Sequence, residues 1–334
     1  MTPFDAVLMI SFGGPQGMAD VRPFLENVLR GRRVAPGRID EVAHHYELFG
    51  GVSPLTALTM AQAEGMAQRL AAAGMPLPVY VGMRNWHPFL ADTLAEMSRA
   101  GVRRAVGVIA AAHRSYSSCT QYKENLAAAR ATLRERGLAD VEVTYVNDWY
   151  THPGFIEANA ARVRDAIATL PTPVQSRAEL VFTAHSIPVS MADKYPYQRQ
   201  FEETSDLIAA RVNADREPDA QLDHVAIYQS RSGRPEDPWL GPDVCEYLRG
   251  LASREGAAAV LSPAGFLIDH VEVLYDLDVE AAAIANEIGL TVARAGTVGD
   301  HPLFLDMLAD VVRTTAARYT AGRPLQLVAR LAHS

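Results

Sequence analysis

Short apolar runs recur along the whole chain, and segments with helical spacing separate them. Most of these runs are nearly continuous in hydrophobicity, which is typical of strands buried on both faces of a parallel sheet. The intervening segments 57–74 and 125–137 have helical patterns, and the second ends at a glycine. The predicted strands cover residues 6–12, 77–83, 104–111, 141–148, 179–185, 222–230, 258–266 and 290–296.

This alternation of strands and helices predicts right-handed crossover units and a doubly wound α/β fold. Four of the strands precede the Pro-containing stretch 170–178 and four follow it. We therefore predict two Rossmann-like parallel-sheet lobes with a cleft between them. The first would span residues 1–170, and the second, which would carry the metal site, residues 171–300. A last helix at about 301–325 is expected to pack back on the first lobe, while the order of strand pairing stays open.

Composition narrows the class of protein. The chain has 334 residues, of which 49% are hydrophobic, enough for a large core and two domains. No apolar run approaches the ~18 residues of a membrane span, and residues 1–14 lack the features of a signal peptide. Two cysteines, Cys119 and Cys245, favour a reducing cytoplasm over a disulfide framework. The formal charge of −8 argues against nucleic acid, although the basic stretch 30–38 could meet an anionic ligand or be a solvated loop.

Ligands of open α/β sheets gather at the carboxyl ends of the strands, so the segments that follow the strands are the candidates for a binding site. Gly13 and Gly14 follow the first strand and permit either a close approach to a ligand or a tight turn. They form neither GxGxxG nor a P-loop, so no nucleotide is predicted. The hydroxyl-rich segment 115–122 could cap a helix or hold ligand carboxylates. Loops as long as 228–244 are usually functional.

Acidic residues lie along one side of the helix predicted after the seventh strand. Glu272, Asp276 and Glu280 are spaced at i, i+4 and i+8, and Asp269 precedes them. Like charges at that spacing destabilise a helix slightly, and residues 267–287 contain no Lys or Arg to interleave. The pattern therefore predicts a divalent metal or a proton relay in preference to a solvated face.

His185 ends the fifth strand and is either a structural or a functional histidine. Together with Glu272 it would offer an imidazole nitrogen and a carboxylate oxygen, which suits Fe(II) without excluding Zn(II), Co(II) or Ni(II). The zinc motifs HExxH and C-x₂-C are absent. A site of two ligands would bind metal weakly, as metal delivery requires.

From end to end the chain resembles the ferrochelatase family. The matching motifs are "LMISFGGP", "FGGVSPLTALT", "GMRNWHPF", "FTAHSIP", "QSRSGRPEDPWLGPD" and "SPAGFLIDHVEVLYDLDVEA", and the last two are the most specific. The resemblance implies an enzyme of heme synthesis that inserts Fe(II), its substrate, into a porphyrin held between two α/β lobes. It implies that His185 and Glu272 form the metal-handling and proton-accepting pair, without deciding which does which. Asp276 and Glu280 would continue it as a secondary metal or proton relay.

The resemblance also suggests which residues contact the porphyrin. Ser53 and Tyr122 match propionate-binding positions, and Tyr46 is expected to join them. Phe12 stands where some members have a tyrosine that ligates iron, a contact that phenylalanine cannot make. Trp239 and Phe266 are expected either to wall the porphyrin site or to belong to the core.

Several motifs resemble the actinobacterial form, which belongs to the branch that metallates coproporphyrin III in solution. Such members often carry a [2Fe–2S] cluster, whose ligands are one cysteine in the first half of the chain and three near the C-terminus. Cys119 matches the first of these ligands. The tail 323–334 contains no cysteine, so no cluster is expected. We predict a cytoplasmic, monomeric ferrochelatase that converts coproporphyrin III to coproheme. The alternatives are a protoporphyrin IX ferrochelatase, a non-catalytic heme carrier and a sirohydrochlorin cobalt chelatase.

Overall fold

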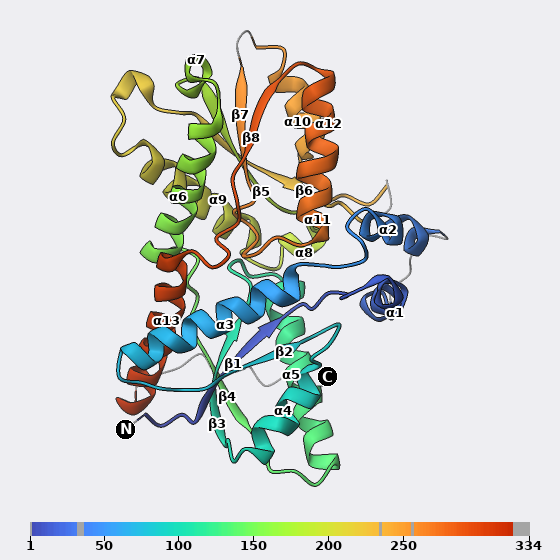
Figure 1. The fold of residues 1–334 in the computed structure, drawn as a ribbon, viewed down its shortest axis with the longest axis vertical. Helices are drawn as coiled ribbons and strands as arrows, with labels where there is room; N and C mark the ends of the chain where they lie inside the picture. The colour runs from blue at the N-terminus through green and yellow to red at the C-terminus, as the bar shows by residue number, and fades with distance from the viewer. Residues whose placement is uncertain (1, 32–36, 234–235, 255–256, 323–334) are drawn as a thin grey trace.

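The computed structural model describes residues 2–31, 37–233, 236–254 and 257–322, which form two parallel sheets in succession (Figure 1). The first sheet has the strand order β2-β1-β3-β4 and the second the order β6-β5-β7-β8. All neighbouring strands are parallel. The strands are β1 (Ala6–Ser11), β2 (Val79–Met83), β3 (Arg104–Ile109), β4 (Glu142–Tyr145), β5 (Ala178–His185), β6 (His224–Gln229), β7 (Ala258–Ser262) and β8 (Thr291–Arg294). The predicted α/β fold is confirmed, and the structure supplies the pairing order that the sequence left open.

Helices cover both faces of the first sheet because its central strand is apolar on both sides. In β1, Val7 and Met9 pack in a cluster with α3 and α13, while Leu8 and Ile10 pack with α4 and α5. The helices of this half of the chain are α1 (Met18–Val28), α2 (Arg38–Glu47), α3 (Leu55–Ala72), α4 (Leu90–Arg99), α5 (Gln121–Glu135) and α6 (Pro153–Thr169), with a π-helix η1 (Tyr116–Thr120) before α5.

The second sheet repeats this arrangement. In β5, Leu180 and Phe182 belong to the cluster that includes α9, and Val181 belongs to the cluster of α10 on the opposite face. The helices here are α7 (Thr172–Gln175), α8 (Val189–Ala192), α9 (Tyr197–Asn213), η2 (Pro218–Ala220), α10 (Val244–Leu251), α11 (Val271–Val273), the π-helix η3 (Leu274–Ala281), α12 (Ala282–Glu287) and α13 (Pro302–Thr320).

Helices and a buried glutamine join the two halves. The last helix, α13, lies against α3 and α6, and a Cβ at Gly65 in α3 would meet Leu305 at 2.6 Å. The buried side chain of Gln62 donates its Nε2 to the carbonyl of Gly299 at 2.8 Å. Helix α6 precedes residue 170 but contacts α9, β7 and β8. The domain boundaries stay a prediction.

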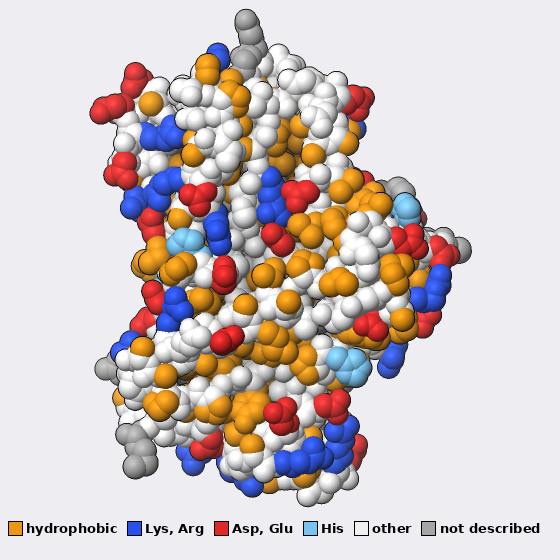
Figure 2. Space-filling view, in the orientation of Figure 1, with side chains coloured by type: hydrophobic (Ala, Val, Ile, Leu, Met, Phe, Trp, Pro, Cys, Tyr) orange, Lys and Arg blue, Asp and Glu red, His pale blue; other side chains and the backbone are white. Residues whose placement is uncertain are grey.

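On the face seen in Figure 2, acidic and basic side chains of the described residues are interspersed. Within the described part of the chain, every helix is too short or too polar to cross a membrane. Residues 32–36 of the basic stretch, residues 323–325 of the predicted last helix and the rest of the tail 323–334 lie outside the described residues.

Candidate active site

His185 lies at the carboxyl end of β5, and its ring has a defined orientation. Its Nδ1 atom is hydrogen-bonded to the carbonyl oxygen of Ser186. A carbonyl oxygen only accepts, so Nδ1 carries a proton, and Nε2 is the nitrogen that is left to face Glu272. The hydroxyl of Tyr197 donates to the backbone carbonyl of His185 at 2.9 Å, which fixes the strand end from the other side.

Glu272 lies in α11, in the segment that follows β7, and faces His185. The Nε2 atom of His185 is 3.7 Å from Oε2 of Glu272, and the two side chains are 32% and 49% exposed. Val271 packs with Phe24 and Tyr46, so the pair lies where the second half meets α1 and α2 of the first. Within the described ranges, His, Cys, Asp and Glu residues form no group of three that could hold a metal ion. The structure thus brings the predicted pair together, while its role stays a prediction.

The acidic segment is wound differently from the regular helix that its spacing predicted. The predicted helix is present as α11, η3 and α12 in direct succession, but residues Leu274–Ala281 form a π-helix, so the α-helical spacing assumed for the acids does not hold there. Short π-helical segments are rare and frequently mark functional sites. The side-chain spacing along this face therefore differs from that of an α-helix.

Asp276 is a partly buried carboxyl held by the end of β6. Ser230 donates its hydroxyl to Asp276 Oδ2, and Gln229 donates its Nε2 to the same oxygen at 3.3 Å. Burial raises the pKa of Asp276 to about 7. The negative charges of Glu272 and Glu280 also raise this pKa, whereas the hydrogen bond from Ser230 lowers it. Among described residues other than glycine, Ser230 alone has a positive φ, of 60°. Such strain is often found at functional sites.

The other acids of this segment have different surroundings. Burial raises the pKa of Glu280, and the carboxylates of Asp243 and Glu41 add to the effect. Asp269 and Asp278 both pair with Arg294 of β8, at 2.7 and 3.2 Å. Asp269 is therefore neutralised by an arginine outside the segment and does not belong to the predicted acidic line.

Phe12 and Tyr46, both predicted to contact porphyrin, lie in one apolar cluster with Phe24 and Val271. The ring of Phe24 is 6.3 Å from that of Phe12 and 5.9 Å from that of Tyr46. Burial raises the pKa of Tyr46 well above its ordinary value, so its hydroxyl stays neutral. This cluster adjoins Glu272, which follows Val271 directly.

Ser53 and Tyr122, the predicted propionate contacts, are buried, with 2% and 5% of their surfaces exposed. Ser53 Oγ accepts a hydrogen bond from the Leu55 amide at 3.4 Å. A Cβ at Gly14 would lie 2.6 Å from the Cβ of Ser53, so this glycine serves the tight packing of the turn. Burial raises the pKa of Tyr122 to about 12. Their predicted contact with a ligand stays a prediction.

Trp239 and Phe266 flank the strand ends of the second half. Trp239 forms a bridge with Pro188, which follows His185 closely, and its indole covers Gly233. Phe266 lies edge-on to His270 with ring centroids 5.1 Å apart. Phe266 is also partly buried against the apolar cluster of α10. It therefore packs on the core, which was the predicted alternative to a contact with porphyrin.

The hydroxyl-rich segment 115–122 caps its own helix and also bonds to neighbouring segments, such as Thr120 Oγ1 to the hydroxyl of Tyr195 at 3.3 Å. Ser115 Oγ accepts from the Ser118 amide at 3.1 Å, and Ser118 Oγ accepts from the Ser115 amide at 2.8 Å. The hydroxyl of Tyr116 donates to Glu124 at 2.9 Å. These contacts agree with the helix-capping interpretation of the segment.

Two features of the site were missed by sequence reasoning. Arg84, at the end of β2, places its guanidinium 5.6 Å from the ring centre of Phe12 and 5.3 Å from that of Tyr122. Its position directly after a strand, in "GMRNWHPF", was the available signal. His45 of α2 stacks on Tyr275 of η3 with centroids 3.6 Å apart and planes within 10°. No local pattern connects those two positions.

The expected absence of an iron–sulfur cluster stays a prediction. Such a [2Fe–2S] cluster takes four cysteine thiolates, and this sequence contains two cysteines. Cys119 lies in η1 of the first half and Cys245 in α10 of the second. Burial raises the pKa of Cys245 to about 12, so that thiol is neutral at physiological pH.

Comparison with solved structures first defines the class of fold. The chain is similar to SirB from Bacillus subtilis with Fe3+, with a TM-score of 0.57 and 12% identity over 96% of this chain and 99% of that one. It is also similar to the sirohydrochlorin chelatase SirB from Bacillus subtilis subspecies spizizenii in complex with cobalt. That match has a TM-score of 0.52 and 12% identity over 95% of this chain and 97% of that one. At such identity the likeness shows the fold alone, which is that of a chelatase.

Comparison of sequences then defines the family. The ferrochelatase family model matches residues 4–316. The coproporphyrin III ferrochelatase of Streptomyces coelicolor is 45% identical over 93% of this chain and 85% of its own length, and that of Frankia alni is 48% identical over 92% and 79%. The ferrochelatase of Rhodopirellula baltica is 42% identical over 94% and 86%. The chain belongs to the ferrochelatase family, whose members are enzymes that insert a metal ion into a porphyrin. The predicted family and the prediction that the protein is an enzyme are both confirmed.

Proposed function

We propose that this ferrochelatase inserts Fe(II) into coproporphyrin III. The reaction places the ion in the macrocycle and releases the two protons of the inner N–H groups. The opposed pair, with Nε2 of His185 3.7 Å from Oε2 of Glu272, is the observation that carries the proposal. The names of relatives from Streptomyces coelicolor and Frankia alni support coproporphyrin III as the substrate.

The spacing of the pair is compatible with one shared ion. Imidazole nitrogen and carboxylate oxygen bind a divalent ion such as zinc at about 2.0–2.2 Å, so two ligands of one ion lie at most about 4.3 Å apart. The separation of 3.7 Å is within that limit. Because Nδ1 of His185 donates to Ser186, Nε2 is the atom that either binds Fe(II) or accepts a pyrrole proton.

Asp276 is suited to take a proton onward from the pair. Its pKa of about 7 means that it is ionised in a large part of the molecules at neutral pH and can gain or lose a proton. The hydrogen bonds from Ser230 and Gln229 hold the carboxylate in place. Glu280, whose pKa burial also raises, would continue the relay toward Asp243.

The apolar cluster beside Glu272 supplies a surface for the macrocycle. Phe12 offers no ligand atom, so we propose that iron receives no oxygen ligand from this position. Coproporphyrin carries four propionates and protoporphyrin two, so the former gains more from a cation near the site. Arg84, which contacts the rings of Phe12 and Tyr122, is such a cation. Resemblance to the coproporphyrin branch further favours a cytoplasmic monomer that needs no nucleotide, and the presence of two cysteines in place of four favours an enzyme without a cluster.

Comparison of two porphyrins under anaerobic conditions tests this function. The purified protein would be mixed with Fe(II) and either coproporphyrin III or protoporphyrin IX, and metallation followed in the visible spectrum. We expect kcat/KM to be at least tenfold higher for coproporphyrin III. Equal or reversed values would refute the substrate assignment.

Two further measurements separate the alternatives. A heme carrier would bind coproheme but leave the spectrum of free coproporphyrin unchanged in the presence of Fe(II). A cobalt chelatase would metallate sirohydrochlorin with Co(II) faster than coproporphyrin with Fe(II). Either result would replace the proposed function.

A further inference from the structure

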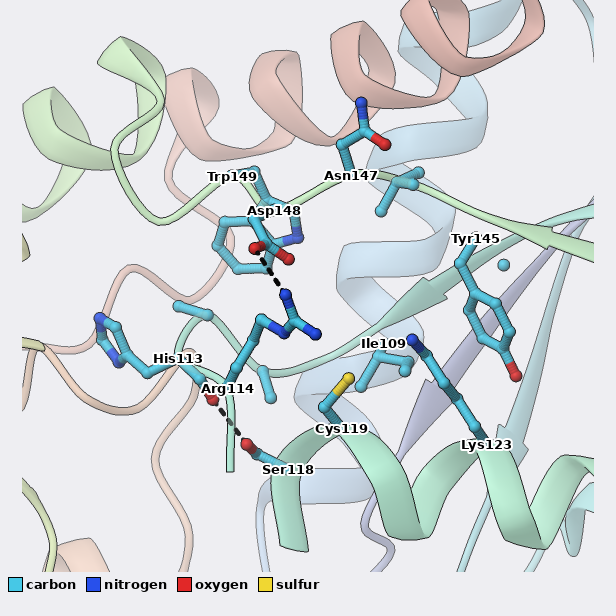
Figure 3. A pocket seen from close by; sticks show the side chains of 14 residues that line it. Ile109, His113, Arg114, Ser118, Cys119, Lys123, Tyr145, Asn147, Asp148 and Trp149 are labelled. Carbon is cyan, nitrogen blue, oxygen red and sulfur yellow. Dashed lines mark hydrogen bonds and ion pairs between the residues drawn. The ribbon is translucent and has the colours of Figure 1, made fainter. Parts of the chain in front are cut away.

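A pocket of about 50 Å³ lies at the carboxyl edge of the first sheet, away from the metallation pair (Figure 3). The ends of β3 and β4, the π-helix η1 and the start of α5 surround it. Open α/β sheets bind ligands at this edge. Phe12 and Arg84 follow β1 and β2, so the pocket lies beside the other two strands of the same sheet. Neither His185 nor Glu272 lines it.

Positively charged and thiol groups converge on this pocket from separate elements. Figure 3 shows the guanidinium of Arg114, the ammonium of Lys123 and the thiol of Cys119 directed at the same space. Asp148 is the one carboxylate among the described residues that line it. Two cations against one carboxylate leave a net positive charge, which favours an anion.

The two cations are held in place before any ligand binds. The backbone amide of Arg114 donates to Gln200 Oε1 at 2.8 Å, and its guanidinium pairs with Asp148 at 3.3 Å. The Lys123 ammonium lies 5.3 Å from the ring centre of Tyr145, a cation–π contact. A preorganised site loses less entropy when it binds its ligand.

The size of the pocket limits the ligand. A water molecule needs roughly 10–15 Å³ of such a cavity, so the pocket of about 50 Å³ accommodates about four waters. An oxyanion of five heavy atoms is of comparable size, whereas a porphyrin is far larger. Ile109, Ala112 and Val146 supply apolar walls, which strengthen the attraction between an anion and the cations.

We infer that this pocket is a second ligand site, which binds a small oxyanion of the phosphate class between Arg114 and Lys123. Cys119 lies at its wall and reports on its occupancy. The anion is either free phosphate or the phosphate of a small phosphomonoester. This site goes beyond the proposed metallation, because it uses none of the residues of the pair.

Protection of Cys119 from a thiol reagent tests the inference. Cys245→Ser would leave Cys119 as the only thiol of the chain, and its labelling rate would be measured while inorganic phosphate is titrated. We expect saturable slowing by at least threefold, with no comparable slowing by chloride at equal ionic strength. Lys123→Gln and Arg114→Gln should each raise the half-saturating phosphate concentration at least fivefold. Arg99→Gln, at an exposed arginine that ends α4, is the matched control.

Equilibrium dialysis of the unmodified protein against labelled phosphate gives the same constant without a cysteine substitution. Glycerol 3-phosphate in place of phosphate separates the two sources, since tighter binding of the ester would assign the site to a phosphomonoester. The absence of saturable binding in dialysis, or unchanged binding in the Lys123→Gln, Arg114→Gln double variant, would overturn the inference. Metallation by Lys123→Gln should stay within twofold of wild type, and its loss would show that the pocket is not separate from the metallation site.

Discussion

The imidazole of His185 and the carboxylate of Glu272 face each other because β5 and β7 are neighbours in the second sheet. The strands pair in parallel, from Ala178 beside Ala258 to Phe182 beside Ser262, so their carboxyl ends emerge at the same edge. His185 ends the first of these strands, and the segment after the second leads to Glu272. Residues far apart in the chain thereby come within 3.7 Å, and both side chains remain partly exposed for a ligand.

Replacing His185 by alanine should abolish iron insertion while porphyrin binding stays within a few fold. Removing a positioned base or ligand lowers kcat by about a hundredfold or more, whereas the apolar cluster around Phe12 and Tyr46 is untouched. Steady-state metallation and porphyrin fluorescence quenching measure the two effects. His224→Ala is the control, since His224 begins β6 at the opposite edge and pairs with Asp206 at 2.9 Å.

The same variant separates the two roles of the imidazole. Added imidazole should restore part of the turnover of His185→Ala if Nε2 accepts a proton. A raised KM for Fe(II) without such rescue would favour iron binding. Near-normal turnover in the variant would remove His185 from the mechanism altogether.

Asp276→Asn should slow metallation several-fold and should change stability in a pH-dependent way. Burial raises the pKa of Asp276 to about 7, so between its ordinary value of 3.8 and 7 the native state retains a proton that the unfolded state has lost. The contribution to stability is therefore fully present at low pH and is lost as pH rises through about 7. A shift of this size corresponds to an upper limit of about 4 kcal/mol, and partial exposure reduces it.

Urea unfolding at two pH values measures this effect. Because asparagine is neutral throughout, the variant should come closest to wild type below about pH 4, and its unfolding free energy should exceed that of wild type increasingly as pH rises to 8, by about 1–2 kcal/mol at the end. Gln229→Leu removes one hydrogen bond to Asp276 but keeps its carboxyl group. This variant would show how the loss of that donor alone changes the unfolding free energy at each pH. An identical difference at the two pH values would exclude ionisation of Asp276 as the cause.

The strands could be predicted because each buried strand is a local run of apolar residues. Apolar runs such as 6–12 and 179–185 had few alternatives to a buried strand, and His185 followed as a strand end. The π-helix could not be predicted, because the spacing of Glu272 and Asp276 is compatible with both windings. The π-helix packs against α10, and Asp276 receives hydrogen bonds from Gln229 and Ser230 at the end of β6, which are contacts with distant parts of the chain.

The site was predicted where a motif and a strand end coincided and was missed where distant elements meet. Asp269 was grouped with the acidic line because Arg294, its partner, lies in the next strand along the chain. Arg84 was noticed only as part of a motif, since its contact with Tyr122 joins the ends of β2 and α5. Long-range side-chain contacts of this kind leave no periodic signal in the sequence.

Arg84→Gln should weaken coproporphyrin binding more than protoporphyrin binding. A charged hydrogen bond contributes about 1.5–3 kcal/mol, so loss of one propionate contact should raise KM for coproporphyrin by roughly tenfold. Protoporphyrin, with half as many propionates, should show a smaller change. Steady-state kinetics with both porphyrins would measure this, and Arg99→Gln is again the surface control. An equal rise for the two substrates would indicate that Arg84 supports the packing of Phe12 and Tyr122 instead.

The stack of His45 on Tyr275 should hold α2 against the π-helix that carries Asp276. The rings are nearly parallel with centroids 3.6 Å apart, and such contacts contribute about 0.5–1.5 kcal/mol beyond buried area. Tyr275→Ala should therefore lower Tm by about 1–4 °C and raise the porphyrin KM several-fold, because α2 carries Tyr46 beside Glu272. Tyr275→Phe keeps the ring and should stay within twofold of wild type. If Tm falls in Tyr275→Ala but the porphyrin KM is unchanged, the stack contributes only to stability. Helix α2 would then keep its position at the porphyrin site without the stacked ring.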